Sequence, residues 1–230
     1  MRIALLSWES MHSIYVGGIA VHVSELAKNL ALKGHDVHAF TRMGEHQPPY
    51  ELIDHVHYHR CAFDLNPTFL LEIENMCRSF VHHLFATEDL IGTFDIVHAH
   101  DWLTANALIW IKNGRQRKTI LTMHSSEYGR CGNSFSGGDS EQINNIEWNG
   151  IYHADKVVAV SKTLREELNW LYSLPENKID VIYNGVNCWE YDGWIDALAV
   201  RRIYEIEDHD PMVLFAGRMV HQKGPDILME

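Results

Sequence analysis

Two histidines end an apolar run near the middle of the chain, and their type and spacing are suited to chemistry. The run Phe94–Val97 is largely apolar, and His98, His100 and Asp101 follow it. Such a run is typical of a strand that is covered on both faces. Two residues apart on a strand, the two imidazoles should point to the same side. Because strand carboxyl ends face the ligand crevice in an open α/β sheet, we expect chemistry beside His100.

The pair admits more than one interpretation. A metal pair is one, although no third ligand follows at a suitable spacing. A neutral imidazole that donates to a sugar hydroxyl or to a backbone carbonyl fits equally well. We interpret His98 as a structural histidine, and His100 as the one nearer the crevice. Asp101 is expected to cap a helix at Trp102–Lys112, with Gly114 as its stop.

A second polar group follows another predicted strand end. His124, Glu127, Tyr128 and Arg130 bring imidazole, carboxylate, phenol and guanidinium close together in the sequence, among serines. This density is typical of polar ligand recognition, and a hydrophilic loop is the alternative. The surrounding segment Ser125–Ser140 is rich in glycine, so we expect a binding loop that is mobile without ligand.

Two further features could hold an anion. Gly17 and Gly18 separate a predicted strand from a predicted helix, where backbone amides could approach a phosphate. The G-x-G-x-x-G fingerprint is absent, so a plain tight turn is the alternative. Arg218 and Lys223 flank a short loop and could converge on one diphosphate. Solvated surface charges are the alternative there.

Three further histidines, His55, His57 and His59, lie on one side of a strand predicted at Glu51–Arg60. Three ligands on one straight strand span about 13 Å at a rise of ~3.3 Å per residue, which is too far to close around one ion. We therefore interpret them as a solvated strand face, and the sequence predicts no metal site.

Composition narrows the class of protein. The chain has 230 residues, of which 46% are hydrophobic, enough for one large domain or one domain and a fragment. With 19 basic and 31 acidic residues the net charge is −12, so no attraction to nucleic acid or to an anionic membrane is expected. The four cysteines form no C-x-x-C pair, which indicates reduced thiols. No run reaches the ~20 apolar residues of a membrane span, and no signal peptide is evident, so we expect a cytoplasmic protein.

Strands and helices alternate along the chain, which predicts an α/β fold with a parallel sheet. Strands are expected at Arg2–Ser7, Asp36–Thr41, Glu51–Arg60, Phe94–Val97, Thr119–Met123, Lys156–Val160, Lys178–Tyr183 and Met212–Ala216. Helices are expected at Val21–Leu32 with Gly34 as its stop, Leu65–Phe85, Trp102–Lys112, Glu141–His153, Lys162–Leu171 with Ser161 as its cap, within Trp189–Tyr204, and at Pro225–Glu230. We expect one domain over residues 1–208 and the beginning of a second, truncated one over residues 209–230.

Several segments together resemble one family. They are Gly17-Gly18-Ile19-Ala20, Val97–Trp102, Thr122-Met123-His124, Ala154–Ser161, Val181–Val186, and Phe215–Arg218 followed by Gln222-Lys223-Gly224. In these motifs the chain resembles the retaining GT-B glycosyltransferases of family 4 type, the group that includes glycogen and starch synthases. The resemblance implies the Rossmann-like N-terminal half of a GT-B fold, an open parallel sheet with helices on both faces.

The resemblance also implies a reaction, the transfer of a hexose from a nucleotide-diphosphate sugar to a carbohydrate or other hydroxyl acceptor. By its motifs, His100 would contact the transferred sugar, and Gly17 and Gly18 would approach the donor. Arg218 and Lys223 would neutralise the leaving diphosphate, so that neither a metal nor a separate cofactor is needed. The acceptor side would use His124, Glu127, Tyr128, Arg130 and Asn184.

Two departures from the family pattern bear on substrate and activity. Tyr15 stands where glycogen and starch synthases carry a lysine, which argues against ADP-glucose and a glucan acceptor. The acidic pair of the family's C-terminal domain is not reached by Glu230, so the chain alone is expected to transfer no sugar. A non-catalytic glycan-binding module and a GT-B sugar-nucleotide epimerase are the alternative functions. The oligomeric state is not predicted.

Overall fold

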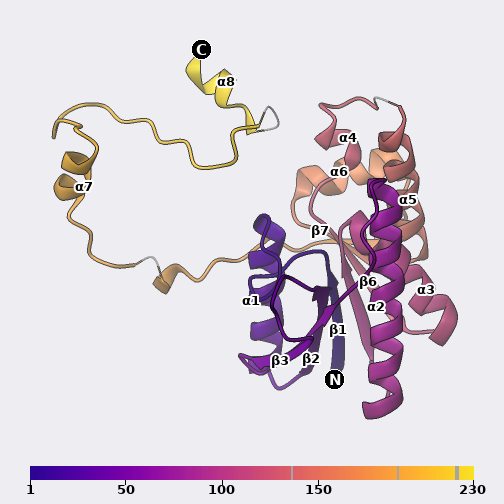
Figure 1. The fold of residues 1–230 in the computed structure, drawn as a ribbon. Coiled ribbons are helices and arrows are strands. Elements are labelled where there is room, and N and C mark those ends of the chain that lie inside the picture. The colour runs from indigo at the N-terminus through magenta and orange to yellow at the C-terminus, as the bar shows by residue number, and fades with distance from the viewer. Residues whose placement is uncertain (136, 191, 221–222) are drawn as a thin grey trace. The chain divides into compact units, whose positions relative to one another are not determined.

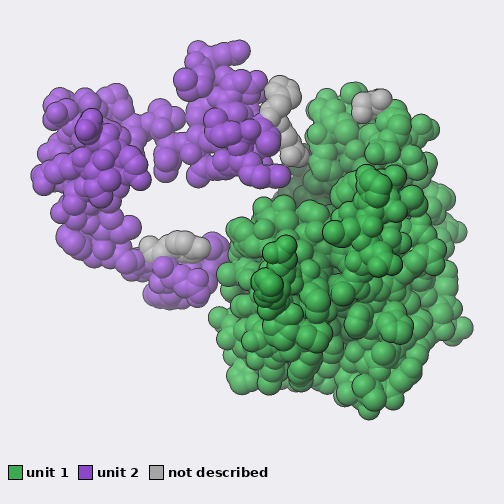
Figure 2. Space-filling model, in the orientation of Figure 1, with its two compact units in different colours: residues 1–184 green, residues 185–230 purple. Residues whose placement is uncertain are grey.

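The computed structural model describes residues 1–135, 137–190, 192–220 and 223–230. Gln222, which belongs to the last predicted motif, lies outside the described residues. The chain divides into two compact units, residues 1–184 and residues 185–230 (Figure 2). The start of a second domain at residue 209 stays a prediction.

The first unit contains an eight-stranded sheet in the order β3-β4-β2-β1-β5-β6-β7-β8. The strands are β1 (Arg2–Ser7), β2 (Asp36–Arg42), β3 (Tyr50–Ile53), β4 (Val56–Cys61), β5 (Ile96–His100), β6 (Lys118–Met123), β7 (Lys156–Ala159) and β8 (Ile179–Val181). Neighbouring strands are parallel apart from β3, which runs antiparallel to β4. The order reverses between β1 and β5, so these two strands form the topological switch point, where ligands bind in such sheets.

Helices cover both faces of this sheet (Figure 1), which confirms the Rossmann-like architecture. They are α1 (Gly18–Leu32), α2 (Phe69–Ile91), the 3₁₀ turn η1 (Trp102–Thr104), α3 (Ala105–Arg115), α4 (Glu127–Arg130), α5 (Asp139–His153), α6 (Lys162–Tyr172) and the 3₁₀ turn η2 (Glu176–Lys178). None of the described helices is both long enough and apolar enough to cross a bilayer.

The core has two layers because successive strand residues point to opposite faces. In β1, Ile3 and Leu5 belong to the apolar cluster around α1, whose Val23 is fully buried. Ala4 and Leu6 belong to the larger cluster that contains α2, α3, α5 and α6. The same alternation in β5 puts Val97 and Ala99 into the larger cluster, so that His98 and His100 face the side of α1.

One predicted strand is wrong in its extent. Residues 51–60 form the hairpin β3–β4 in place of a single strand, because Asp54 and His55 adopt positive φ angles of 49° and 64° and turn the chain. The interpretation of His57 and His59 as a solvated face is also wrong. Both rings stack on His38 of β2, with centroids 4.4 and 5.2 Å away.

One predicted helix end is wrong as well. Gly114 lies inside α3, which continues to Arg115 and ends at Gln116 in the left-handed conformation. A Cβ at Gly114 would stand 3.1 Å from the Phe85 ring, so this glycine permits close packing against α2. By contrast, Gly34 follows α1 with a φ of 84°, and the Ser161 hydroxyl accepts from the Leu164 amide, as predicted.

The second unit contains the 3₁₀ turn η3 (Cys188–Glu190) and the helices α7 (Ala197–Ile203) and α8 (Pro225–Met229). Helical structure within Trp189–Tyr204 and after Gly224 is thereby confirmed. The strand predicted at Met212–Ala216 is absent from the described part of this unit. Val213 and Leu214 are 78% and 80% exposed, and a strand without a pairing neighbour leaves its backbone groups unpaired.

Candidate histidine site at the switch point

Four imidazoles gather on the α1 side of the sheet, at the carboxyl ends of β5 and β6. His98 and His100 stack with ring centroids 4.4 Å apart, which confirms that they point to the same side. His98 Nε2 lies 2.7 Å from the Thr122 hydroxyl, so this ring is held within the fold. His124, which follows β6, places its Nε2 3.4 Å from His100 Nδ1.

The fourth imidazole belongs to His22 in the second turn of α1, a residue that the sequence analysis did not single out. Its ring meets those of His100 and His124 edge-on, with centroids 5.3 and 4.7 Å apart. The side chain of Asn184 hydrogen-bonds to His22. The structure therefore brings the predicted residues His100, His124 and Asn184 together around a histidine. Its spacing in the sequence could have indicated it, because His22 lies four residues after Gly18 and therefore on the same side of the predicted helix.

All four imidazoles are held in the neutral form. Burial, reinforced by the neighbouring histidines, lowers the pKa of His98 and of His124 to about 3 and lowers that of His100 well below its usual value. Burial also lowers the pKa of His22. A neutral ring has one donor and one acceptor nitrogen, so the cluster can bind hydroxyl groups but does not supply positive charge.

Two ring nitrogens of the cluster have unused hydrogen-bonding capacity. Within the described part of the chain, His100 Nε2 and His22 Nε2 are buried and have no hydrogen-bond partner. A buried polar atom without a partner is costly, so such atoms indicate a place where a ligand binds. His22, His100 and His124 also offer ring nitrogens within 4.8 Å of one another, close enough to share a cation. The expectation that no metal is required stays a prediction.

The glycine pair lies at the start of α1, the helix that carries His22. Gly17 stands at the N-cap and Gly18 is the first helical residue. Glu9 Oε2 accepts hydrogen bonds from the amides of Val16 at 2.8 Å and Gly17 at 2.6 Å. A Cβ built on Gly18 would meet no described atom within 4 Å, so the helix terminus is open on that side.

Two of the predicted acceptor residues belong to a buried ionic network. Arg130 Nη2 lies 2.5 Å from Glu147 of α5, and its Nε lies 3.0 Å from Glu127. Its Nη1 lies 2.7 Å from the Ser125 hydroxyl and 3.8 Å from Asp101. These contacts tie α4 to the residue that caps η1, where Asp101 accepts from the Trp102 amide at 3.2 Å as predicted.

One guanidinium faces three carboxyl groups in this network. Burial raises the pKa of Asp101 to about 6 and that of Glu147 to about 7, against the opposing charge of Arg130. The carboxylates in turn raise the pKa of Arg130 against the effect of its burial. Glu127 and Arg130 thus bond to protein groups, and their predicted acceptor contacts stay a prediction.

Tyr128 lies apart from the imidazoles. Its ring packs against Phe135 and Trp170 of α6, with centroids 5.5 and 5.2 Å apart. The segment Ser125–Ser140 is therefore partly ordered, with Ser126 capping α4 through the Gly129 amide. The prediction that this segment is a binding loop, mobile without ligand, stays a prediction.

Arg218 and Lys223 belong to the second unit. The Val220 amide donates to the Arg218 carbonyl and the Lys223 amide donates to the Val220 carbonyl, each at 2.9 Å. Gly224 then starts α8 in a left-handed conformation. Convergence of the two cations on a diphosphate stays a prediction.

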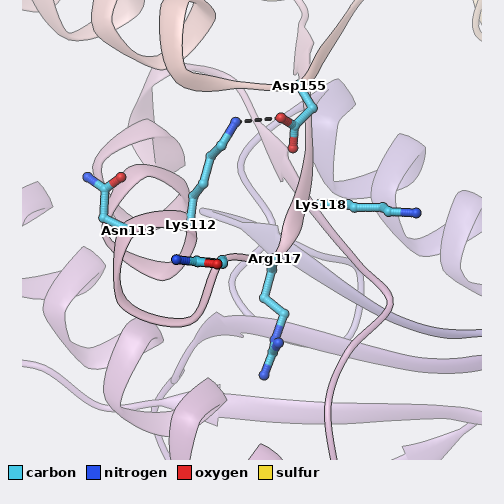
Figure 3. A pocket seen from close by; sticks show the side chains of 6 residues that line it. Lys112, Asn113, Arg117, Lys118 and Asp155 are labelled. Atoms are coloured by element: carbon cyan, nitrogen blue, oxygen red, sulfur yellow. Dashed lines mark hydrogen bonds and ion pairs between the residues drawn. The ribbon is translucent and has the colours of Figure 1, made fainter.

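A hollow of about 620 Å³ lies by the amino end of β6 (Figure 3). It is lined by Lys112, Asn113, Gln116, Arg117, Lys118 and Asp155. Lys112 Nζ is bonded to Asp155 at 2.5 Å, and Arg117 Nε to Glu88 at 2.7 Å. These cations are already paired, so the hollow is a weaker candidate for an anion site than the switch point.

The fold and the site define a Rossmann-like α/β unit with a cluster of neutral imidazoles at its switch point. Residues 16–190 match the family described as Glycosyltransferase Family 4. The chain belongs to this family, as its motifs indicated.

Known proteins similar to the chain are glycosyltransferases. An uncharacterized glycosyltransferase of Methanocaldococcus jannaschii is 36% identical to it over 100% of the chain and 58% of the relative. A glycogen synthase of Mycobacterium tuberculosis is 28% identical over 97% of the chain and 56% of that enzyme. The chain thus spans little more than half the length of these relatives.

Solved structures show the same fold. A sucrose-phosphate synthase from Thermosynechococcus elongatus superposes with a TM-score of 0.78 at 21% identity, over 99% of the chain and 58% of that structure. The GT-B type of architecture predicted for the chain is thereby confirmed.

Proposed function

We propose that the chain forms the acceptor-side part of a retaining glycosyltransferase, which moves a hexose from a nucleotide-diphosphate sugar to a carbohydrate or other hydroxyl acceptor. Its membership of the glycosyltransferase family supports the reaction class. The retaining course, the hexose and the diphosphate donor rest on the resemblance of its motifs to that family.

One observation carries the proposal, the pair of buried ring nitrogens without partners on His100 and His22. A sugar presents several hydroxyls, each of which can donate and accept, and neutral imidazoles match them. The cluster lies at the carboxyl end of β5, beside the open terminus of α1. The N-terminus of α1 favours binding of the donor's phosphate, whereas the neutral imidazoles suit the hydroxyls of its sugar.

The leaving group needs positive charge that the neutral histidines do not supply. We assign this role to Arg218 and Lys223, which would neutralise the diphosphate without a metal ion. The phosphate oxygen would take the acceptor's proton as the new glycosidic bond forms on the same face of the sugar. The residues that recognise the donor's hydroxyls would lie in a C-terminal domain, so the chain alone transfers no sugar.

A chimera tests this function. The chain is joined after Glu230 to the part of the Methanocaldococcus relative that follows the matched segment, and UDP-, ADP- and GDP-hexoses are offered with oligosaccharide acceptors. We expect nucleotide release and a glycoside whose anomeric configuration, read by NMR, equals that of the donor. We expect no transfer by the chain alone.

Three other results would contradict the proposal. A product of inverted configuration would contradict the retaining course. Epimerised hexose that forms without an acceptor would indicate the epimerase. Calorimetric binding of oligosaccharide with no nucleotide release by the chimera would indicate the glycan-binding module.

A further inference from the structure

A second group of imidazoles lies on the other face of the sheet. His38 of β2 and His57 of β4 are paired in register and stacked, and Asp36 precedes His38 by two residues on the same side. One ring nitrogen from each histidine and one oxygen of Asp36 lie within 4.8 Å of one another. We propose that Asp36, His38 and His57 form a binding site for a divalent transition-metal ion such as Zn²⁺.

The distances between the ligand atoms suit such an ion. Asp36 Oδ1 lies 3.0 Å from His38 Nε2 and 3.7 Å from His57 Nε2. A tetrahedral site with ligands at ~2.0–2.1 Å separates its ligand atoms by about 3.3 Å. The two observed distances bracket this value. Two imidazoles and one carboxylate are ligands that Zn²⁺ and similar ions accept, and they leave a fourth position for water.

The Nδ1 atoms of both rings already lie within hydrogen-bond distance of other side chains. The Tyr50 hydroxyl lies 2.7 Å from His57 Nδ1, and His59 Nε2 lies 2.9 Å from His38 Nδ1. A ligating histidine commonly bonds its other ring nitrogen in this way. When the ion replaces the hydrogen bond between Asp36 and His38, the His38 proton moves to Nδ1 and is donated to His59 Nε2, whose own proton moves to the His59 Nδ1. No net change of charge on the rings is needed.

Ring orientation and the neighbouring Arg2 both affect how well this site can bind an ion. The rings of His38 and His57 are within 12° of parallel, so one of them must tilt to aim its lone pair at a shared ion. The His57 side chain is 32% exposed and has room to do so. Arg2 Nε bonds Asp36 Oδ2 at 2.8 Å, which leaves Oδ1 for the ion and orients the carboxylate. Its positive charge weakens ion binding without blocking it.

This site is separate from the histidines at the switch point. Phe40, two residues after His38, belongs to the core cluster of α2, whereas His100 faces α1. In the sheet register, His38 is level with Ala4 and therefore with Val97, three residues before His100. The Asp36 side chain is 40% exposed, so an ion can enter from solvent. Its effect would be to cross-link β2 and β4, and hence to stabilise the fold.

Titration of the metal-free chain with Zn²⁺, followed by calorimetry, tests the proposal, and Co²⁺ provides an absorption signal of the ligand geometry. We expect one ion to bind tightly, with a Tm that rises as the ion is added. Asp36→Asn and His57→Gln should each weaken binding at least about tenfold, as loss of a metal-ligand contact does. His55→Gln in the adjacent turn and His22→Gln in the other cluster should leave this binding unchanged.

The proposal is overturned if the chain binds no Zn²⁺, if both ligand variants bind as the unaltered chain does, or if only His22→Gln abolishes binding. Asp36→Asn also loses the contact with Arg2, so circular dichroism should confirm that it folds. His57→Gln changes a partly exposed residue and keeps the test decisive if Asp36→Asn does not fold. Tyr50→Phe removes only the outer hydrogen bond and should weaken binding by a smaller factor.

Discussion

The carboxylate of Glu9 accepts a hydrogen bond from the Gly17 amide, with 2.6 Å between Oε2 and the nitrogen. The same oxygen accepts from Val16 at 2.8 Å. The Glu9 side chain thus stabilises the turn that precedes α1. The following residue, Gly18, is left to begin the helix with its outer side open.

Replacing Glu9 should loosen this turn. In Glu9→Ala the two part-buried amides lose their charged acceptor, and we expect a loss of about 1–3 kcal/mol in the free energy of unfolding. Hydrogen exchange at Val16 and Gly17 should accelerate. The exposed residue Glu45 provides the control, since Glu45→Ala should change neither quantity. Unchanged exchange at both amides in Glu9→Ala would show that the carboxylate does not hold the turn.

Glu88 should be among the most sensitive positions of the fold. Its side chain is 1% exposed, bonds Arg115 at 3.0 Å and Arg117 at 2.7 Å, and accepts from the Phe94 amide at 2.9 Å. Glu88→Ala leaves Arg117 and the Phe94 amide without this partner and leaves Arg115 only its exposed pair with Asp89, and we expect urea unfolding to show a loss of ~3–5 kcal/mol. Asp89→Ala is the control, because its exposed pair with Arg115 should contribute less than ~1 kcal/mol. Equal losses in the two variants would refute this ranking.

Replacement by alanine should destabilise the chain at Gly150 but not at Gly18. A Cβ at Gly150 would stand 2.6 Å from Ala105 Cβ, so Gly150→Ala should cost about 1–3 kcal/mol through overpacking. A Cβ at Gly18 has open space on the side that the structure describes, so Gly18→Ala should keep the stability of the chain. In the active chimera it should instead raise KM for the nucleotide sugar, because a methyl group intrudes where the donor approaches. Thermal unfolding and steady-state kinetics measure the two effects.

The histidine cluster should make the chain sensitive to acid. Burial lowers the pKa of His124 to about 3, whereas an unfolded histidine titrates near ~6.5. Between these values the unfolded chain binds more protons, so stability falls as the pH drops below ~6.5. In His124→Gln, the loss of stability between pH 7 and pH 5 should be smaller by roughly 1–2 kcal/mol. The exposed His46→Gln should leave it unchanged, and an identical pH dependence in His124→Gln would contradict the burial of a neutral ring.

Much of the fold could be predicted from the sequence, because its signals are local. Apolar runs and Gly34 located β1, α1 and β2, and Ser161 located the start of α6. The hairpin β3–β4 was missed since its turn is made by Asp54 and His55, which adopt positive φ without a glycine. Gly114 suggested a helix end, whereas tertiary packing against Phe85 keeps it helical.

The site was predicted in part for a similar reason. His100 and His124 follow strands, so the rule for carboxyl ends located them. His22 comes from a helix, and only the packing of α1 on the sheet brings it to the other rings. The buried partners of Arg130 likewise lie on other elements, at Asp101 and Glu147, and no spacing within the sequence connects them.

The proposed function depends on His100, and the turnover rate of the active chimera measures what this residue contributes. If its unpaired Nε2 binds the transferred sugar, His100→Ala should lower kcat by about 10²–10³, a loss typical of a group that stabilises developing charge. The exposed variant His46→Ala should keep the rate of the unaltered chimera. A His100→Ala chimera that folds and turns over within about threefold of the unaltered protein would contradict a catalytic contact at the switch point.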